Sequence, residues 1–359
     1  MMPILTEEEH RWKYWMPQEP SDEFVEAIPE SIRSLKIFDP AVGSGHFLII
    51  AFTVLAAFYE EEARHLCKNW EPKQIAEWII EENLHGVDID PRAVQIAAAA
   101  VFLKAKTYAK DAAPSIVNLV ASNFGIASLP KNDQAILDLK QALKEEIDLS
   151  EEMADIILEA ISQADYLGSL LKIDEAVQEA IAQYRRQFEP RQLEIGETVS
   201  EDAKPSFSDE QAEATIFENL VEFLNRRTSS EDLGLRLRGE QLAAGVRFIQ
   251  LVRKGEYDLV IANPPYLGAG KMQHRRYIEK HYSISKADLY AVFIQRGIEL
   301  VDFAKLRGLS AMITMRGWMF IKDYEDLRAF ILPQKTVSRI GIVNLTDVNQ
   351  NWARSSLDR

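Results

Sequence analysis

Short apolar runs alternate with longer stretches of helical periodicity in the first and last thirds of the chain. A run of β-branched and aliphatic residues without polar alternation is typical of a strand that is buried on both faces. Apolar positions spaced three and four residues apart predict the intervening helices. We expect strands at 35–38, 84–89, 116–121, 258–262, 309–314 and 339–343, and helices at 47–65, 71–82, 93–109, 287–303 and 323–331. This alternation predicts an α/β fold built around a parallel sheet.

The alternation is interrupted between residues 131 and 250. Helical periodicity continues there without any strand pattern, and 190–208 is polar and loop-like. We interpret this stretch as an α-helical insertion in one α/β domain. The expected organisation is an approach segment at 1–34, a first half at 35–130, the insertion at 131–250, a second half at 251–345 and an irregular tail at 346–359.

Composition narrows the class of protein. The chain has 359 residues, of which 47% are hydrophobic and 27% charged, which is enough to form a full core. Its single cysteine, Cys67, allows no intrachain disulfide and favours a cytoplasmic setting. No apolar window is long enough to span a membrane, and the N-terminus is not typical of a secretory signal. We therefore expect no membrane partner.

The net charge of −15 is distributed unevenly. Residues 131–210 hold 20 acidic and 8 basic residues, whereas 253–339 hold 15 basic and 9 acidic ones. The acidic insertion is therefore expected to pack against the domain or bind a partner rather than to read DNA. The later, basic part could contact phosphates, with an ordinary solvated surface as the alternative.

A glycine-rich turn joins the first predicted strand to the first long helix. Its sequence, Asp39-Pro40-Ala41-Val42-Gly43-Ser44-Gly45, allows a sharp turn and a close approach of backbone to a ligand. The third glycine of a dinucleotide-binding turn is replaced by Leu48, which disfavours NAD. Asp88 lies at the end of the second strand, where such folds hold ribose hydroxyls. Asp90, just before a proline, is expected to cap the next helix.

The fourth predicted strand runs into Asn263-Pro264-Pro265-Tyr266. The prolines cannot continue the sheet, because each lacks an N–H and has a fixed φ. The motif therefore puts an amide side chain and an aromatic ring on a stiff loop at the carboxyl end of a buried strand. In open α/β sheets this edge is where ligands bind. A basic stretch, expected to be a loop, follows at 271–281.

These three motifs occur in order, each at a strand end: Asp39–Gly45, Asp88 in Gly-Val-Asp-Ile-Asp-Pro, and Asn263–Tyr266. The combination resembles the S-adenosylmethionine-dependent N6-adenine DNA methyltransferases. Within them it is most similar to the large enzymes of fused restriction–modification (Type IIG) and BREX-type phage-defence systems. The resemblance covers 35–130 and 250–345. It implies a class I methyltransferase Rossmann-like sheet with helices on both faces, double-stranded DNA as substrate, and other defence-system subunits as candidate partners.

The resemblance also assigns roles around the cofactor, S-adenosylmethionine. Asp39 would contact its methionine end, and Asp88 its ribose hydroxyls. Asn123 and Phe124, after the third strand, would hold the adenine, and Phe293 would pack against the same ring. The implied cofactor-binding residues are Asp39, Pro40, Ala41, Gly43, Gly45, Asp88, Asn123, Phe124 and Phe293. No metal is implied.

The implied catalytic residues are Asn263, Pro264, Pro265 and Tyr266. The exocyclic amine of adenine is a poor nucleophile, because its lone pair is delocalised into the ring. The Asn263 side-chain oxygen and the Pro264 carbonyl can accept hydrogen bonds from the N–H groups of this amine and stabilise charge that forms on its nitrogen. Tyr266 would stack on a base flipped out of the duplex. Ring-carbon methylation would need a thiolate, and Cys67 lies in no such motif, so we interpret it as structural.

Some features of the family are not found. No Thr-Pro element is present in 1–35, and neither a seventh strand nor a target-recognition domain follows Val343. We therefore expect a fragment that binds the cofactor weakly and methylates DNA poorly by itself. Three alternatives stay open: methylation of an RNA base or a protein glutamine, a non-catalytic DNA- or partner-binding subunit, and target recognition by the 131–250 insertion.

Overall fold

The computed structural model describes residues 31–122, 164–172, 257–272, 274–301 and 308–332, with 137, 140, 141, 155, 175, 248, 251 and 252 as single positions. The chain divides into two compact units, Met1–Pro264 with Arg296–Met312 and Pro265–Gln295 with Ile313–Arg359. Most of the insertion, the predicted strand at 339–343, Asn123 and Phe124 lie outside the described residues.

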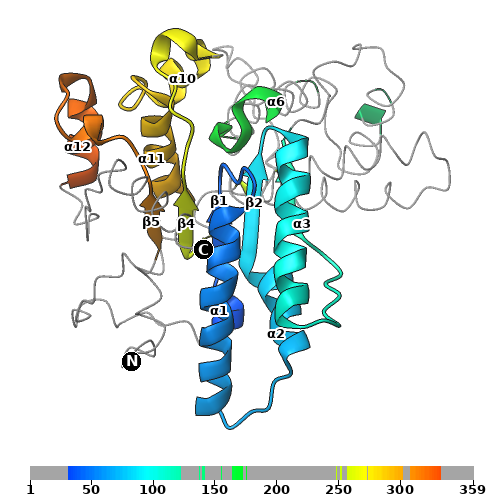
Figure 1. Ribbon diagram of the computed structural model, residues 1–359. Coiled ribbons are helices and arrows are strands. Elements are labelled where there is room, and N and C mark those ends of the chain that lie inside the picture. The colour runs from blue at the N-terminus through cyan, green and yellow to red at the C-terminus, as the bar shows by residue number, and fades with distance from the viewer. Residues whose placement is uncertain are drawn as a thin grey trace, which may run out of the picture. The chain divides into compact units, whose positions relative to one another are not determined.

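The first unit is built on a sheet of five parallel strands (Figure 1). The strands are β1 Ile37–Asp39, β2 Leu84–Asp88, β3 Asn118–Ala121, β4 Leu259–Ala262 and β5 Leu309–Met312, in the spatial order β3-β2-β1-β4-β5. β2 to β5 each lie within a predicted strand, and β1 extends one residue, Asp39, past the predicted strand at 35–38. The order reverses beside β1, because β1 pairs with β2 on one side and with β4 on the other. This is the switch point at which open α/β sheets bind ligands.

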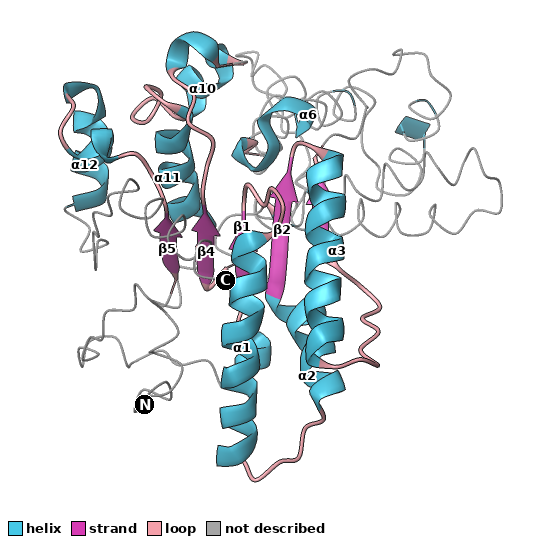
Figure 2. Ribbon diagram, viewed as in Figure 1, coloured by secondary structure: helices cyan, strands magenta, loops and turns pink. Residues whose placement is uncertain are grey.

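Three helices cover one face of the sheet: α1 His46–His65, α2 Pro72–Trp78 and α3 Pro91–Tyr108 (Figure 2). A π-helix, η4 Ile79–Asn83, continues α2 into β2. Asp90 caps α3 as predicted, since its carboxylate accepts the Arg92 N–H at 2.9 Å. The core between these helices and the sheet is formed by Ile37, Val42, Leu48, Ala51, Phe52, Leu55, Ala56, Tyr59, Ile75, Ala76, Ile79, Ile80, Leu84, Val94, Ala97, Val101, Ala105, Ala109 and Ala112.

The other face of the sheet is contacted by the end of α11 (Leu289–Leu300), of which Arg296 and the residues after it belong to the first unit. Leu259 and Ile261 pack against the core beneath α1–α3, so Val260, between them, points to the opposite face. A Cβ placed on Gly297 would lie 3.6 Å from Val260 Cγ1, which shows that α11 is in close contact there. Helices on both faces, as predicted, are thus confirmed.

A buried amide ties the start of β1 to the helical layer. Asn83 is 0% exposed; its Nδ2 donates to the carbonyls of Ile32 at 2.8 Å and Leu35 at 2.7 Å. Its Oδ1 accepts the Tyr59 hydroxyl at 2.9 Å. One side chain therefore satisfies three partners at the entrance to β1, which fixes where the strand begins.

The remaining short elements correct one expectation. The basic stretch at 271–281 contains a helix, α10 Arg275–His281, rather than a loop; its mostly charged residues show no apolar period that would have predicted it. In the insertion, α6 Ala164–Leu167 is followed by a 3-10 turn, η6 Gly168–Leu170. The other elements are η3 Ile32–Ser34, η8 Ala269–Lys271, η9 Arg316–Met319, η10 Lys322–Tyr324 and α12 Glu325–Ile331. Among the described helices, none has the length and hydropathy needed to cross a membrane.

Candidate functional site

The glycine-rich turn after β1 is held against the end of β2. Gly43 N–H donates to Asp88 Oδ2 at 2.9 Å, and Val42 N–H donates to the Val87 carbonyl at 3.0 Å. The other carboxylate oxygen of Asp88 accepts the Asp90 N–H at 2.9 Å. Each oxygen retains a second lone pair. Asp88 thus holds the turn through a hydrogen bond and can still accept a hydrogen bond from a ligand hydroxyl.

Asp39 ends β1 beside the same turn and is 1% exposed. Its Oδ1 accepts the Ala41 N–H at 3.0 Å. The pKa of Asp39 is raised to about 7: burial is the main cause, the neighbouring charge of Asp88 adds to it, and the Ala41 hydrogen bond opposes both. A cation beside this carboxylate would stabilise its ionised form, because the hydrogen bond offsets only part of the free-energy cost of burying the charge.

Gly45 makes the start of α1 possible. Its φ of +81° lies in the left-handed region, and a Cβ there would lie 3.0 Å from the Ala97 Cβ. α1 therefore begins directly after the turn and crosses closely over α3. Gly43, with φ of +51°, makes the other left-handed bend of the turn.

The end of β3 carries an unsatisfied group. Ser122, directly after β3, is 0% exposed, and its hydroxyl has no hydrogen-bond partner among the described residues. An unpaired buried hydroxyl costs free energy, so this position retains capacity for a polar ligand atom. Asn123 and Phe124 follow outside the described residues, and their adenine-binding roles stay predictions.

Asn263 and Pro264 follow β4, which pairs directly with β1. Both strands are parallel, so Asn263 and Asp39 emerge at the same edge of the sheet, on neighbouring strands. Asn263 is exposed, and Pro264 is buried. The rigid proline anchors the loop while the amide side chain reaches the surface.

Pro265 and Tyr266 belong to the second unit, where Tyr266 has a built environment. Its hydroxyl donates to the Ile313 carbonyl at 3.1 Å, and its ring meets Tyr290 edge-to-face, with centroids 5.9 Å apart. Tyr266 as a whole residue is nevertheless 46% exposed. Burial raises the pKa of Tyr266, so the phenol stays neutral. Phe293 lies in the same unit and is buried, so its contact with a cofactor stays a prediction.

The first unit's residues fit a nucleoside carrying a cationic group. Asp39 offers buried negative charge, Asp88 offers acceptors for hydroxyls, and Gly43 and Gly45 allow close approach of the turn. Cys67 lies in the turn beyond the far end of α1, about 30 Å of helix away from Gly45. Among the described residues, no group of His, Cys, Asp and Glu side chains could hold a metal ion.

Fold and motifs together define an α/β protein of the class I methyltransferase type, with a candidate ligand site at the switch point of its sheet. A comparison with protein families agrees: residues 82–348 match the Eco57I restriction-modification methylase model. The chain belongs to this family, and as a methyltransferase family it implies a methyl donor.

Curated relatives carry matching descriptions. The chain is 28% identical over 322 residues to an adenine-specific methyltransferase PglX of Lacticaseibacillus casei, with 88% of this chain and 23% of the relative covered. It is 28% identical over 317 residues to an adenine-specific methyltransferase BrxX of Escherichia coli, covering 86% and 23%. A putative type II restriction enzyme and methyltransferase of Methanocaldococcus jannaschii is 39% identical over 77 residues, covering 21% and 6%. The chain spans about a quarter of the length of the first two.

The structure also brings in residues that the sequence did not point to. The η6 turn of the insertion lies beyond the carboxyl ends of β1 and β2 (Figure 1), and Ser169 donates to the Pro40 carbonyl at 2.7 Å. The one available signal was the short apolar stretch Leu167-Gly168-Ser169-Leu170-Leu171 inside a polar, acidic segment.

Proposed function

We propose that this chain contributes the methyl-transfer domain of an S-adenosylmethionine-dependent DNA methyltransferase that acts on the N6 amine of adenine, in a restriction–modification or phage-defence system. One observation carries the proposal. The Asp39–Gly45 turn and Asn263–Pro264 emerge at the same edge of the sheet, from the paired strands β1 and β4. The family membership and the adenine-specific relatives support the choice of adenine.

In this proposal Asp39 pairs with the ammonium of the cofactor's methionine end, and Asp88 accepts hydrogen bonds from its ribose hydroxyls. Gly43 and Gly45 line the turn. The cofactor, when bound, supplies an electrophilic methyl group. Its cationic ammonium would stabilise the ionised form of the buried Asp39 carboxylate, since an ion pair offsets part of the desolvation cost.

Asn263 and Pro264 prepare the acceptor amine. The Asn263 side-chain oxygen and the Pro264 carbonyl each accept a hydrogen bond from one N–H of this amine. These hydrogen bonds orient the nitrogen lone pair away from the ring and stabilise the charge that develops on the nitrogen. The prolines hold both acceptors in place before the substrate arrives. Tyr266, which is partly exposed, stacks on the flipped base. A DNA substrate would put this activity in the cytoplasm, in keeping with the single cysteine.

The test is single-molecule sequencing of DNA from cells that express the complete gene or its Asn263→Ala variant. We expect N6-methyladenine at one sequence motif with the parent gene and its loss with the variant, since removal of one preorganised group at a reacting centre typically costs about 10²–10³ in rate. Calorimetry should show equal cofactor binding by both proteins. If DNA stays unmethylated while RNA or protein receives a labelled methyl group, those molecules are the substrates instead of DNA. If the parent protein does not bind the cofactor, the proposal is refuted.

A further inference from the structure

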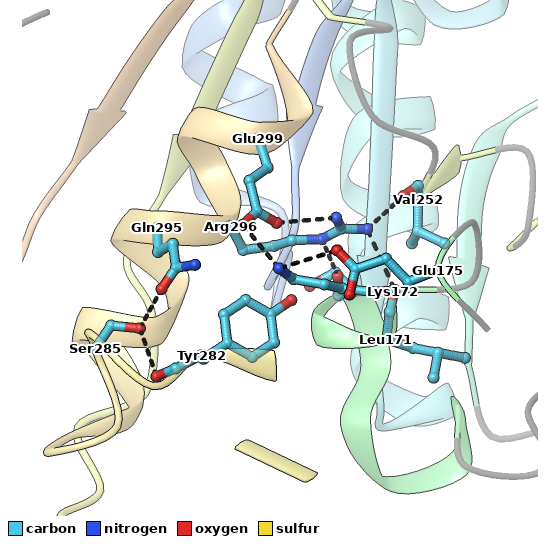
Figure 3. Close-up of polar contacts among 10 residues, drawn as sticks. Leu171, Lys172, Glu175, Val252, Tyr282, Ser285, Gln295, Arg296 and Glu299 are labelled. Atoms are coloured by element: carbon cyan, nitrogen blue, oxygen red, sulfur yellow. Dashed lines mark hydrogen bonds and ion pairs between the residues drawn. The ribbon is translucent and has the colours of Figure 1, made fainter. Parts of the chain in front are cut away.

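A buried arginine holds the η6 turn in place. Arg296, on the last turn of α11, is 0% exposed (Figure 3). Its Nε donates to the Ser169 carbonyl at 2.9 Å, and its Nη2 donates to the carbonyls of Leu171 and Val252. Arg296 thereby joins residues 169–171, which lie within the predicted insertion at 131–250, to Val252, which lies just after it. Five donors in a planar fork allow one side chain to bind several carbonyls at once.

The charge of Arg296 is balanced within the same network (Figure 3). Glu299 Oε2 lies 3.4 Å from Arg296 Nη1, and Glu299 Oε1 lies 2.9 Å from Lys172 Nζ. Lys172 also pairs with Glu175 at 3.4 Å. Two cations and two carboxylates thus compensate one another next to the turn. A buried guanidinium with these partners is expensive to disturb, so the turn is held rigidly.

Ser169 passes this constraint on to the glycine-rich turn, Asp39–Gly45. It is 1% exposed, and its hydroxyl donates to the Pro40 carbonyl at 2.7 Å. The same peptide unit carries the Ala41 N–H, which donates to Asp39 Oδ1 at 3.0 Å. The Pro40–Ala41 peptide plane is therefore held at both ends, by Ser169 at its oxygen and by Asp39 at its nitrogen. Rotation of that plane would break both bonds.

Gly168 shows how closely the turn fits against the strand ends. Its φ is +54°, and a Cβ there would lie 2.9 Å from Ile89 Cγ2, after β2, and 3.7 Å from the unpartnered Ser122 hydroxyl, after β3. The η6 turn thus bonds to the loop after β1 through Ser169 and lies close to the ends of β2 and β3 at Gly168. This segment of the insertion belongs to the wall of the candidate site.

We propose that Ser169 is a positioning residue for cofactor binding: through the Pro40–Ala41 peptide it sets the orientation of the Asp39 carboxylate, and Arg296 holds Ser169 in register. The inference rests on the proposed function, because it takes Asp39 as the partner of the cofactor's ammonium. It gives part of the insertion a role in the methyl-transfer site that its acidic composition does not predict.

Calorimetric titration of the 359-residue chain with S-adenosylmethionine tests this role. Ser169→Ala removes one buried hydrogen bond, so we expect the dissociation constant to rise roughly fivefold to tenfold. The maximal rate of transfer at saturating cofactor should stay unchanged, because Ser169 touches no reacting atom. In an Asp39→Asn background the same change should have little further effect, since coupled residues are not additive. Amide exchange at Ala41 should also become faster in Ser169→Ala.

Ser285→Ala is the matched control. Ser285 is likewise fully buried, and its hydroxyl contacts the Gln295 side chain at 2.7 Å and the Tyr282 carbonyl (Figure 3). It should lower the melting temperature comparably without changing the cofactor dissociation constant. A parent-like dissociation constant for Ser169→Ala, an equal loss in the control, or full additivity with Asp39→Asn would overturn the inference alone. Absence of cofactor binding by the parent chain would instead refute the proposed function, and the inference with it.

Discussion

The buried carboxylate of Asp39 makes a quantitative prediction about cofactor binding. Its pKa of about 7 results from burial and from the nearby charge of Asp88. If the ionised form is the one that pairs with the cofactor's ammonium, the apparent affinity is reduced by the fraction of Asp39 that is ionised. That fraction falls from about one half near pH 7 to about 3% near pH 5.5. The dissociation constant should therefore rise roughly fifteenfold across this interval.

The assay is calorimetric titration of S-adenosylmethionine in buffers with different heats of ionisation. Near pH 7 binding should release about half a proton from Asp39, which shows as a buffer-dependent heat. The ligand's own α-amino group titrates near pH 8, so measurements stay at or below about pH 7. Asp39→Asn keeps an oxygen for the Ala41 N–H but cannot ionise. This variant should bind weakly and show a flat profile.

The same carboxylate affects the stability of the unliganded chain. Because the pKa of Asp39 is raised on folding, the folded state holds a proton that the unfolded state releases near pH 4. Its contribution to stability is therefore present at low pH and is lost as the pH rises toward 7. Asp39→Asn should thus stabilise the unliganded chain near pH 8, on the order of a few kcal/mol. Parent-like pH profiles for both binding and unfolding in Asp39→Asn would refute the reasoning.

Three further predictions concern stacking and the core. Tyr266→Ala should weaken single-turnover methylation of DNA by roughly 1–3 kcal/mol, and Tyr266→Phe by much less; equal losses would contradict stacking by the ring. Gly45→Ala should lower the free energy of unfolding in urea by about 1–3 kcal/mol, since its φ is +81° and Ala97 lies 3.0 Å from the new Cβ; an unchanged midpoint would contradict this. Asn83→Ala should lower the free energy of unfolding by at least about 2 kcal/mol, because three buried groups lose their hydrogen-bond partner. Asn118→Ala removes one partly buried hydrogen bond and should lower it by about 1 kcal/mol. Similar losses in the two variants would contradict the role of burial.

The alternation of strands and helices was predictable from the sequence, because it depends on local periodicity and on turn residues that act over a few positions. β1 to β5, α1, α3 and the Asp90 cap all lie where the pattern put them, within a few residues at their ends. The Asp39–Gly45 turn and the Asn263–Tyr266 loop were likewise visible as motifs. Both combine glycine or proline, which set the backbone, with side chains of distinctive chemistry. α10 was missed, because its mostly charged residues have no apolar stripe to reveal a helix.

Tertiary structure decided what surrounds those motifs. Ser169 meets Pro40 across 129 positions of sequence, and Arg296 meets Ser169 across 127. No local pattern encodes such pairs, since they arise only when the sheet brings separate strand ends to one edge. The pKa of Asp39 depends in the same way on burial and on Asp88, which lies on another strand. The sequence by itself determined which groups are available for the proposed methyl transfer. The folded chain decided which of them are buried, charged and held in place, because desolvation and hydrogen-bond geometry depend on neighbours that are distant in sequence.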